Sequence, residues 1–162
     1  MLRAPRHYEL ALPVAAQPPA VFAFADDHAS FSSHMNKPSW MMGGGRMEVV
    51  LDEGRGQRVG SHIRLQGRVF GLPLSLDEVV TRHEPPRVKT WETVGTPQLL
   101  VVGNYRMGIE IAPQGSGSTL RVFIDYDLPA KNAWLGRLFG GMYAQWCVRQ
   151  MSNDVRDHFI TT

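Results

Sequence analysis

Hydrophobic and polar residues alternate at the start of the chain. Between His7 and Val14, the residues Tyr8, Leu10 and Leu12 fall on one face, and polar or small residues fall on the other. A period of two is typical of a strand with one buried face. The same period returns later and predicts six further strands, near residues 47–51, 63–69, 74–80, 88–93, 99–111 and 120–128. Because short turns separate them, the pattern predicts an antiparallel meander.

Two short helices are predicted between the first strand and this meander. Two adjacent prolines end the first strand, and proline is accepted in the first turn of a helix, here residues 19–25. Asp26 or Asp27 ends that helix and can cap a second one over residues 28–35. Pro38 and the three glycines that follow it then predict a loop.

The hydrophobic period becomes helical from about Asn132 to Phe159. An apolar stripe marks this helix: Leu135, Leu138, Phe139, Met142, Trp146, Met151, Val155 and Phe159. Gly140 and Gly141 lie inside it, although glycine costs about 1 kcal/mol in a helix interior. The pair therefore marks either a bend or a place where another backbone or a ligand comes close.

The order of elements predicts an α+β fold in one domain, residues 1–162. Hydrophobic residues make up 43% of the chain and charged residues 20%, which is an ordinary globular balance. A sheet with one apolar face must be covered, and only the C-terminal helix is long enough to cover it. We expect a curved antiparallel sheet of about seven strands wrapped around that helix, with the two short helices closing one end.

Three segments carry a resemblance to a known superfamily. They are Pro19-Ala-Val-Phe-Ala-Phe-Ala-Asp26 after the opening strand, Val80-Thr-Arg-His-Glu-Pro-Pro-Arg87, and Asp125-Tyr-Asp-Leu-Pro129 before the last helix. With these, the chain resembles the START-like, or SRPBCC, helix-grip superfamily, in particular its polyketide cyclase/dehydrase-like branch and its birch-pollen-allergen (Bet v 1-like) relatives. The resemblance covers nearly the whole chain. It implies the helix-grip fold and a ligand, apolar or amphipathic, bound between sheet and helix; a minority of such proteins are enzymes.

Charge and residue spacing exclude several other classes. The net charge is +2 with scattered cations, so we expect no nucleic-acid partner. The six histidines lack metal-ligand spacing and the glycine run lacks phosphate-loop residues, so we expect neither a metal nor a cofactor. The single cysteine, Cys147, cannot form an internal disulfide, so we expect a cytoplasmic protein. We expect its side chain to be a small buried hydrophobic group. No apolar run approaches the length of a membrane-spanning helix.

A candidate pocket follows from the inward-facing apolar and aromatic side chains. Its expected ligand-binding residues are Met47, Leu65, Leu76, Tyr105, Met107, Tyr126, Met142 and Trp146, capped by Trp40 and Met42. Methionine suits a cavity that adapts to varied ligands, although the same side chains also fill ordinary cores. Trp40 and Met42 lie beside the three glycines and predict a lid over the pocket mouth; the alternative is a loop packed permanently on the core.

Glu78 is the candidate catalytic residue. If Leu76 and Val80 point inward, Glu78 does too, and a buried carboxyl is either neutral or paired. It would then act as a general acid/base or contact a ligand headgroup. The alternative is a structural ion pair with a cation such as Arg106.

Three functions remain open from the sequence. The first is binding of a hydrophobic small molecule or lipid, with transport or sequestration as its use. The second is an enzyme of the cyclase/dehydratase or isomerase type, in which Glu78 and a pocket tyrosine orient and protonate a polyketide-like substrate without a metal or nucleotide cofactor. The third is recruitment to a membrane surface or a partner protein through Arg64 and Arg68. We expect a monomer or a homodimer.

Overall fold

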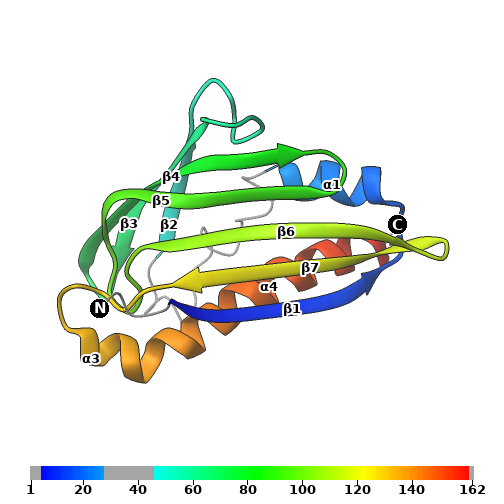
Figure 1. Ribbon diagram of the computed structural model, residues 1–162. Helices are drawn as coiled ribbons and strands as arrows, with labels where there is room; N and C mark the ends of the chain where they lie inside the picture. Colours follow the sequence, from blue (N-terminus) through cyan, green and yellow to red (C-terminus); the bar gives the residue numbers. More distant parts are fainter. Residues whose placement is uncertain (1–4, 28–45, 161–162) are drawn as a thin grey trace.

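The computed structural model describes residues 5–27 and 46–160 (Figure 1). All strand pairs are antiparallel, and the seven strands lie in the order β1-β7-β6-β5-β4-β3-β2. Their bounds are β1 (Arg6–Val14), β2 (Arg46–Leu51), β3 (His62–Val69), β4 (Leu72–Glu84), β5 (Val88–Gln98), β6 (Tyr105–Gln114) and β7 (Gly117–Tyr126). The predicted meander is confirmed, and the sheet folds back so that the first and last strands are neighbours.

The helices lie at one end and across one face of the sheet. Helix α1 (Pro18–Asp26) follows β1, and the C-terminal helix consists of α3 (Ala133–Leu135), η3 (Gly136–Gly140) and α4 (Gly141–Ile160). Helix α4 contacts β1, β7 and α1, behind the sheet in Figure 1. The predicted C-terminal helix and the helix-grip α+β fold are confirmed. The second short helix and the loop after it lie outside the described residues.

A close backbone contact explains the glycines at the start of the C-terminal helix. A Cβ at Gly140 would lie 2.7 Å from the carbonyl oxygen of Val101, and one at Gly136 would lie 3.0 Å from the same oxygen. These positions are one turn apart and fall in the π-helical turn η3. The connection between β5 and β6 therefore lies directly on the helix, and the predicted close approach of another backbone is confirmed at Gly140.

Two strand boundaries differ from the predicted ones by five residues or more. Strand β5 continues to Gln98 instead of ending at residue 93, and β6 begins at Tyr105 instead of residue 99. In the connection, the Gly103 N–H donates to the carbonyl of Asp127 at 2.7 Å, and a Cβ at Gly103 would lie 2.6 Å from the carbonyl oxygen of Leu128. The apolar residues 99–102 thus mimic a strand but pack as a loop against the chain that follows β7.

The core has two parts. The larger hydrophobic cluster contains residues of helices α1 and α4 and of strands β1, β5, β6 and β7. The smaller cluster contains residues of β2, β3 and β4. Tyr143 and Trp146 of α4 pack against the smaller cluster. Strand β4 has irregular pairing with β5 at Ser75/Asp77 and again at Val80/Arg82, and bulges of this kind bend a strand. The bent strand β4 therefore curves the sheet around the helix.

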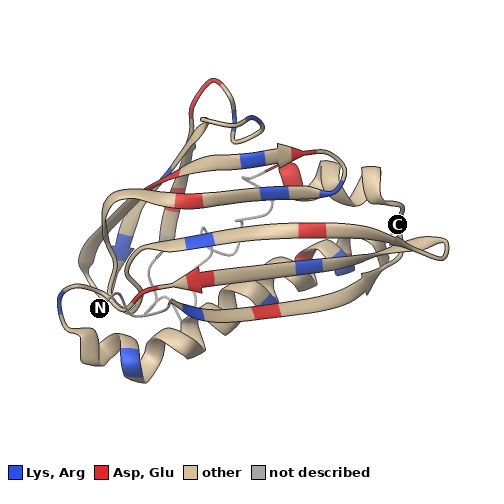
Figure 2. Cartoon of the chain, in the orientation of Figure 1, with Lys and Arg blue, Asp and Glu red and all other residues tan. Residues whose placement is uncertain are grey.

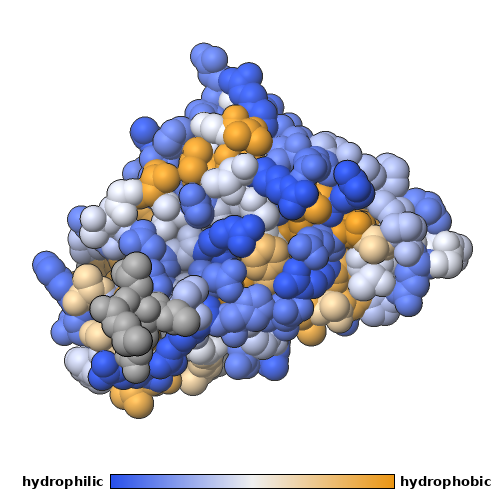
Figure 3. Space-filling model, in the orientation of Figure 1, coloured by the Kyte–Doolittle hydropathy of each residue, from blue (hydrophilic) through white to orange (hydrophobic). Residues whose placement is uncertain are grey.

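The outer face of the sheet carries charges of both signs and is largely hydrophilic (Figures 2 and 3). Arg121 Nε lies 2.6 Å from Glu9 Oε2, and Arg121 Nη1 lies 2.9 Å from Glu110 Oε2. His7 Nδ1 lies 2.6 Å from Asp125 Oδ1. Exposed pairs of this kind add little stability. No helix within the described ranges is long and apolar enough to cross a bilayer.

Candidate ligand-binding site

An apolar pocket of about 510 Å³ opens where the C-terminal helix begins. Three segments line it: the β3–β4 turn, the β5–β6 connection and the first turns of the helix, which meet at the left end of the molecule in Figure 1. The lining residues are Phe70, Leu72, Leu100, Val101, Leu135, Phe139, Met142 and Tyr143. Pockets of this volume with apolar walls are typical of small-molecule sites.

A group of buried and half-buried polar side chains reaches the pocket through Tyr143, and we call it the pocket cluster: Glu78, Tyr105, Tyr143 and Cys147. Glu78 is only 2% exposed, and the Tyr105 hydroxyl donates a hydrogen bond to its Oε2. Tyr143, which also lines the pocket, shares a hydrogen bond with Cys147 one helical turn further on. Tyr143 therefore connects the apolar wall to the polar interior.

Burial fixes the protonation of most of the pocket cluster. Desolvation raises the pKa of Tyr105 and of Tyr143 well above the usual value, and it raises the pKa of Cys147 to about 12. All three groups therefore keep their protons at neutral pH, and Cys147 is a buried thiol rather than a nucleophile, as predicted. Within the cluster, Glu78 accepts the hydrogen bond that the Tyr105 hydroxyl donates.

The inward direction of Glu78 follows from the strand period. Leu76, Glu78 and Val80 alternate with more exposed residues along β4 and are all buried. The predicted alternative partner, Arg106, points to the outer face, where its Nη1 lies 3.9 Å from Asp125 Oδ2. The predicted alternative, an ion pair between Arg106 and Glu78, is therefore wrong, because residues 105 and 106 of β6 face opposite sides of the sheet.

A second buried polar group, the charged cluster, ties α1 to the sheet. Asp26 Oδ1 lies 2.9 Å from Lys89 Nζ, and Asp26 Oδ2 lies 2.9 Å from His83 Nε2. Lys89 is fully buried. Desolvation lowers the pKa of Lys89, while the hydrogen bond and charge of Asp26 and the charge of Glu78 act in the opposite direction. None of the three members lines the apolar pocket; their contacts join α1 to β4 and β5 instead.

The predicted ligand-binding residues fall into four groups. Those buried in or packed on the smaller core cluster are Met47, Leu65, Leu76, Tyr105 and Trp146; those buried in the larger one are Met107 and Tyr126. Met142 lines the pocket and is 48% exposed. Trp40 and Met42, with the predicted lid, lie outside the described residues. The structure thus brings Tyr105 and Trp146 to the Tyr143 side of the smaller cluster, and it places Met107 and Tyr126 elsewhere in the core.

Several pocket residues escaped the sequence reasoning. Phe70 and Leu72 flank Gly71 in a tight turn, where polar residues are usual. The aromatic residue at this turn could have indicated a contact surface from the sequence alone. Tyr143 is adjacent to Met142 and one turn before Cys147, so the apolar stripe alone did not select it. Lys89 and Asp26 gave no signal, because their pairing joins positions far apart in the chain.

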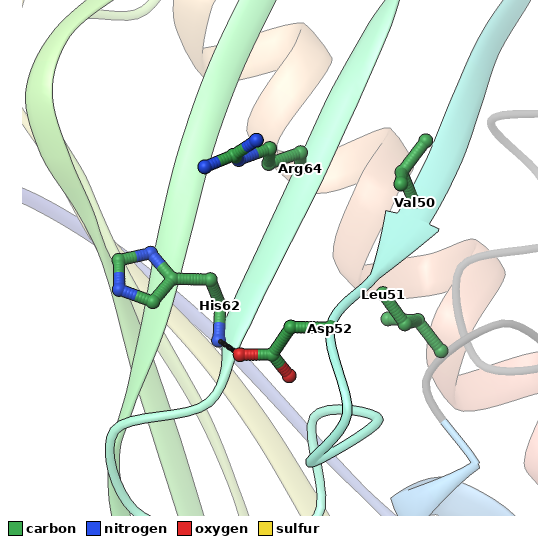
Figure 4. Close-up of a pocket in the computed structure, with 5 residues that line it drawn as sticks. All are labelled: Val50, Leu51, Asp52, His62 and Arg64. Atoms are coloured by element: carbon green, nitrogen blue, oxygen red, sulfur yellow. Dashed lines mark hydrogen bonds between the residues drawn. The ribbon is translucent and has the colours of Figure 1, made fainter.

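A second hollow of about 280 Å³ lies beside the edge strand β2 (Figure 4). Its lining residues are Val50, Leu51, Asp52, His62 and Arg64. Asp52 accepts hydrogen bonds from the backbone N–H of His62 at 2.8 Å and of Gly54 at 3.0 Å. These bonds lower the pKa of Asp52. Asp52 therefore holds the turn after β2, and this hollow supplies no candidate chemistry.

An antiparallel sheet closed on a long helix, with an apolar pocket beside that helix, defines a helix-grip protein of the SRPBCC superfamily. A model of the family described as "Polyketide cyclase / dehydrase and lipid transport" matches residues 6–156. The chain belongs to this family, and the resemblance drawn from the sequence is confirmed. No curated protein matches the chain.

Solved structures show the same fold at low sequence identity. TTHA0849 from Thermus thermophilus is 14% identical, with a TM-score of 0.69 over 96% of this chain and 98% of that one. A norcoclaurine synthase mutant from Thalictrum flavum, in complex with a transition-state analogue, is 14% identical, with a TM-score of 0.67 over 99% and 98%. Major latex-like protein 151 from Panax ginseng is 11% identical, with a TM-score of 0.59 over 97% and 99%.

Proposed function

We propose that this protein binds a hydrophobic small molecule or lipid, with its apolar body in the pocket at the start of the C-terminal helix. The observation that carries the proposal is the 510 Å³ pocket itself, whose lining side chains are all apolar except that of Tyr143. A cavity of this kind favours apolar ligands through burial of their surface. The family description, which includes lipid transport, supports the same class of ligand.

The pocket cluster gives the ligand a preferred orientation. Tyr143 faces the pocket, and Tyr105 and Glu78 lie behind it in the interior. A ligand with one hydrogen-bonding group would place that group at Tyr143, because an unpaired polar group costs free energy when it is buried in apolar surroundings. We therefore propose an elongated ligand with a single polar end.

Native mass spectrometry of protein purified without detergent tests this proposal. We expect the mass of the chain plus one small hydrophobic molecule, and loss of that molecule from a Phe139→Gln variant. Ile160→Gln is the matched control, because Ile160 is an exposed apolar residue of the same helix far from the pocket lining. Ligand-free wild-type protein that also fails to take up an apolar dye would contradict the proposal.

A second candidate function, catalysis, is favoured by the hydrogen bond between Tyr105 and Glu78. A buried carboxyl beside a phenol can hold a proton and exchange it with a substrate, as general acid/base catalysis requires. One structural neighbour is a synthase that holds a transition-state analogue. Incubation with an aromatic polyketide tests this function: an enzyme yields product that Glu78→Gln abolishes, whereas a binding protein returns the compound unchanged.

A further inference from the structure

Apolar side chains are concentrated around the pocket mouth. Six of the nine large hydrophobic residues exposed in the described chain lie there, and we call them the apolar rim: Phe70, Leu72, Trp134, Leu138, Phe139 and Met142. Their exposed fractions run from 46% to 69%. Side chains of this size leave on the order of 600 Å² of apolar surface in water, at the upper end for a monomer. Such a surface indicates that something covers it.

The helix start presents apolar residues on both of its outward faces. Gly136 and Gly140 face the Val101 carbonyl, so this side of the helix is closed. Trp134 and Leu138 are one turn apart on one open face, and Phe139 and Met142 are on the next. A helix that is apolar nearly all round is normally buried or inserted in a membrane.

The β3–β4 turn presents a strained aromatic residue to the same surface. Phe70 has a φ of 54°, in the left-handed region, and it is 69% exposed. A bulky residue is rare in this conformation and gains nothing there from contact with water. Phe70 lines the pocket and still leaves most of its ring open to a contact with another surface.

The charged residues within the segments that carry the apolar rim are cations, and the acidic residue nearest to these segments along the chain is Asp127. The segments 68–72, 99–101 and 131–142 contain Arg68, Lys131 and Arg137 and no acidic residue. All three cations are exposed, and the start of the C-terminal helix carries blue and no red in Figure 2. Aromatic and apolar side chains flanked by cations are typical of protein surfaces that enter the interface of an anionic bilayer.

We propose that the apolar rim docks on the surface of an anionic lipid bilayer, with the pocket mouth turned toward the lipid. A second copy of the chain fits this surface less well, because a two-fold contact would gather the cations of both copies in one interface. Of the two residues predicted for a recruitment surface, Arg68 lies beside the apolar rim, whereas Arg64 lies next to Asp77. The proposal does not depend on whether the pocket holds a ligand.

Sedimentation with vesicles tests the apolar part of the docking surface. We expect the full chain to bind vesicles of phosphatidylcholine mixed with phosphatidylglycerol. Exchange of Trp134→Gln together with Leu138→Gln should weaken this binding about tenfold or more. Neither residue lines the pocket, so dye binding should stay unchanged and show that the variant is folded. Ile160→Gln, equally exposed at the far end of α4, should bind vesicles like the wild type.

The charge of the surface is tested with the same vesicles. Lys131→Gln and Arg137→Gln should each weaken binding about fivefold at low salt, whereas the exposed Arg64→Gln should have no effect. The proposal would be overturned if the wild type did not bind anionic vesicles. It would also be overturned if the Trp134→Gln/Leu138→Gln variant bound them as tightly as the wild type. A concentration-dependent dimer that the rim variant abolishes, without vesicle binding, would assign the surface to a second copy instead.

Discussion

The charged cluster and the pocket cluster are both buried under the same sheet, yet their chemistry and surroundings differ. The charged cluster consists of ionisable groups at ion-pair distance, and it lies between α1 and strands β4 and β5. The pocket cluster consists of one carboxyl and three groups that burial keeps protonated. Only the pocket cluster shares a residue with the apolar pocket, namely Tyr143.

This difference underlies our proposal that the charged cluster is structural and the pocket cluster takes part in ligand binding. A buried ion pair is costly to break, because the remaining partner is left charged without compensation. Neutral hydroxyl groups beside a cavity can exchange partners at lower cost, so a ligand can take part in their hydrogen bonds. Burial of polar side chains therefore does not by itself identify a candidate ligand site. Polar side chains that are buried next to a cavity are the better indication.

The largest effect is expected for Lys89→Met. The substitution removes the ammonium group 2.9 Å from Asp26 Oδ1 and leaves that buried carboxylate with His83 as its remaining partner. We expect a loss of about 3–5 kcal/mol in the free energy of unfolding, measured by urea denaturation. In the double variant Asp26→Asn/Lys89→Met, the loss should be clearly less than the sum of the single losses. A loss under about 1 kcal/mol for Lys89→Met would remove the structural role of the charged cluster.

A smaller effect on stability is expected for Glu78→Gln. The amide oxygen of Gln can still accept the hydrogen bond from Tyr105, so the free energy of unfolding should fall by no more than about 1.5 kcal/mol. The change in the binding free energy of the co-purified ligand, or in the activation free energy of turnover, should exceed the change in the free energy of unfolding. Urea denaturation and ligand titration on the same samples compare the two. Marked unfolding of the variant would place Glu78 with the charged cluster, as a residue of the fold.

The smallest effect is expected on the outer face of the sheet. Arg121 and His7 lower the pKa of Glu9 to about 2. The folded pKa lies below the ordinary value of 4.5, so the stabilisation is complete above about pH 4.5 and is lost as the pH falls toward about 2. Since Glu9 is exposed, we expect only a small fall in Tm over this range, and a smaller one in high salt.

Glu9→Gln is the control for that acid effect. Its Tm should depend less on pH between about 4.5 and 2 than that of the wild type, because the variant has no carboxyl at this position. If Tm depended on pH in the same way in both proteins, the contact between Glu9 and Arg121 would contribute nothing to stability in solution.

The sequence predicted the strands and the C-terminal helix because their periods are local properties. The period of two placed Leu76, Glu78 and Val80 on one face, and the structure buries all three. The boundary at Tyr105 was wrong because the apolar residues 99–102 have a strand-like composition. Their loop is fixed by backbone contact with residues after β7, which lie far along the chain.

The site was less predictable than the fold because it depends on three-dimensional neighbours. Glu78 and Met142 were predicted, but the hydrogen bond to Tyr105 and the place of Tyr143 in the pocket wall come from the packing of α4 on the sheet. Phe70 reaches the pocket only because the β3–β4 turn ends beside the helix start. Pairings of this kind leave no period in the sequence.

Titration with a neutral, environment-sensitive apolar dye tests the central claim, that the pocket at the start of the C-terminal helix is the ligand site. The wild type should bind the dye at about one site. Met142→Trp should weaken binding, because the larger side chain takes up space at the pocket wall, and it should cost little stability since Met142 is half exposed. Ile160→Trp, on the same helix and away from the pocket, should bind like the wild type. Equal dye affinity in wild type and folded Met142→Trp would contradict the account.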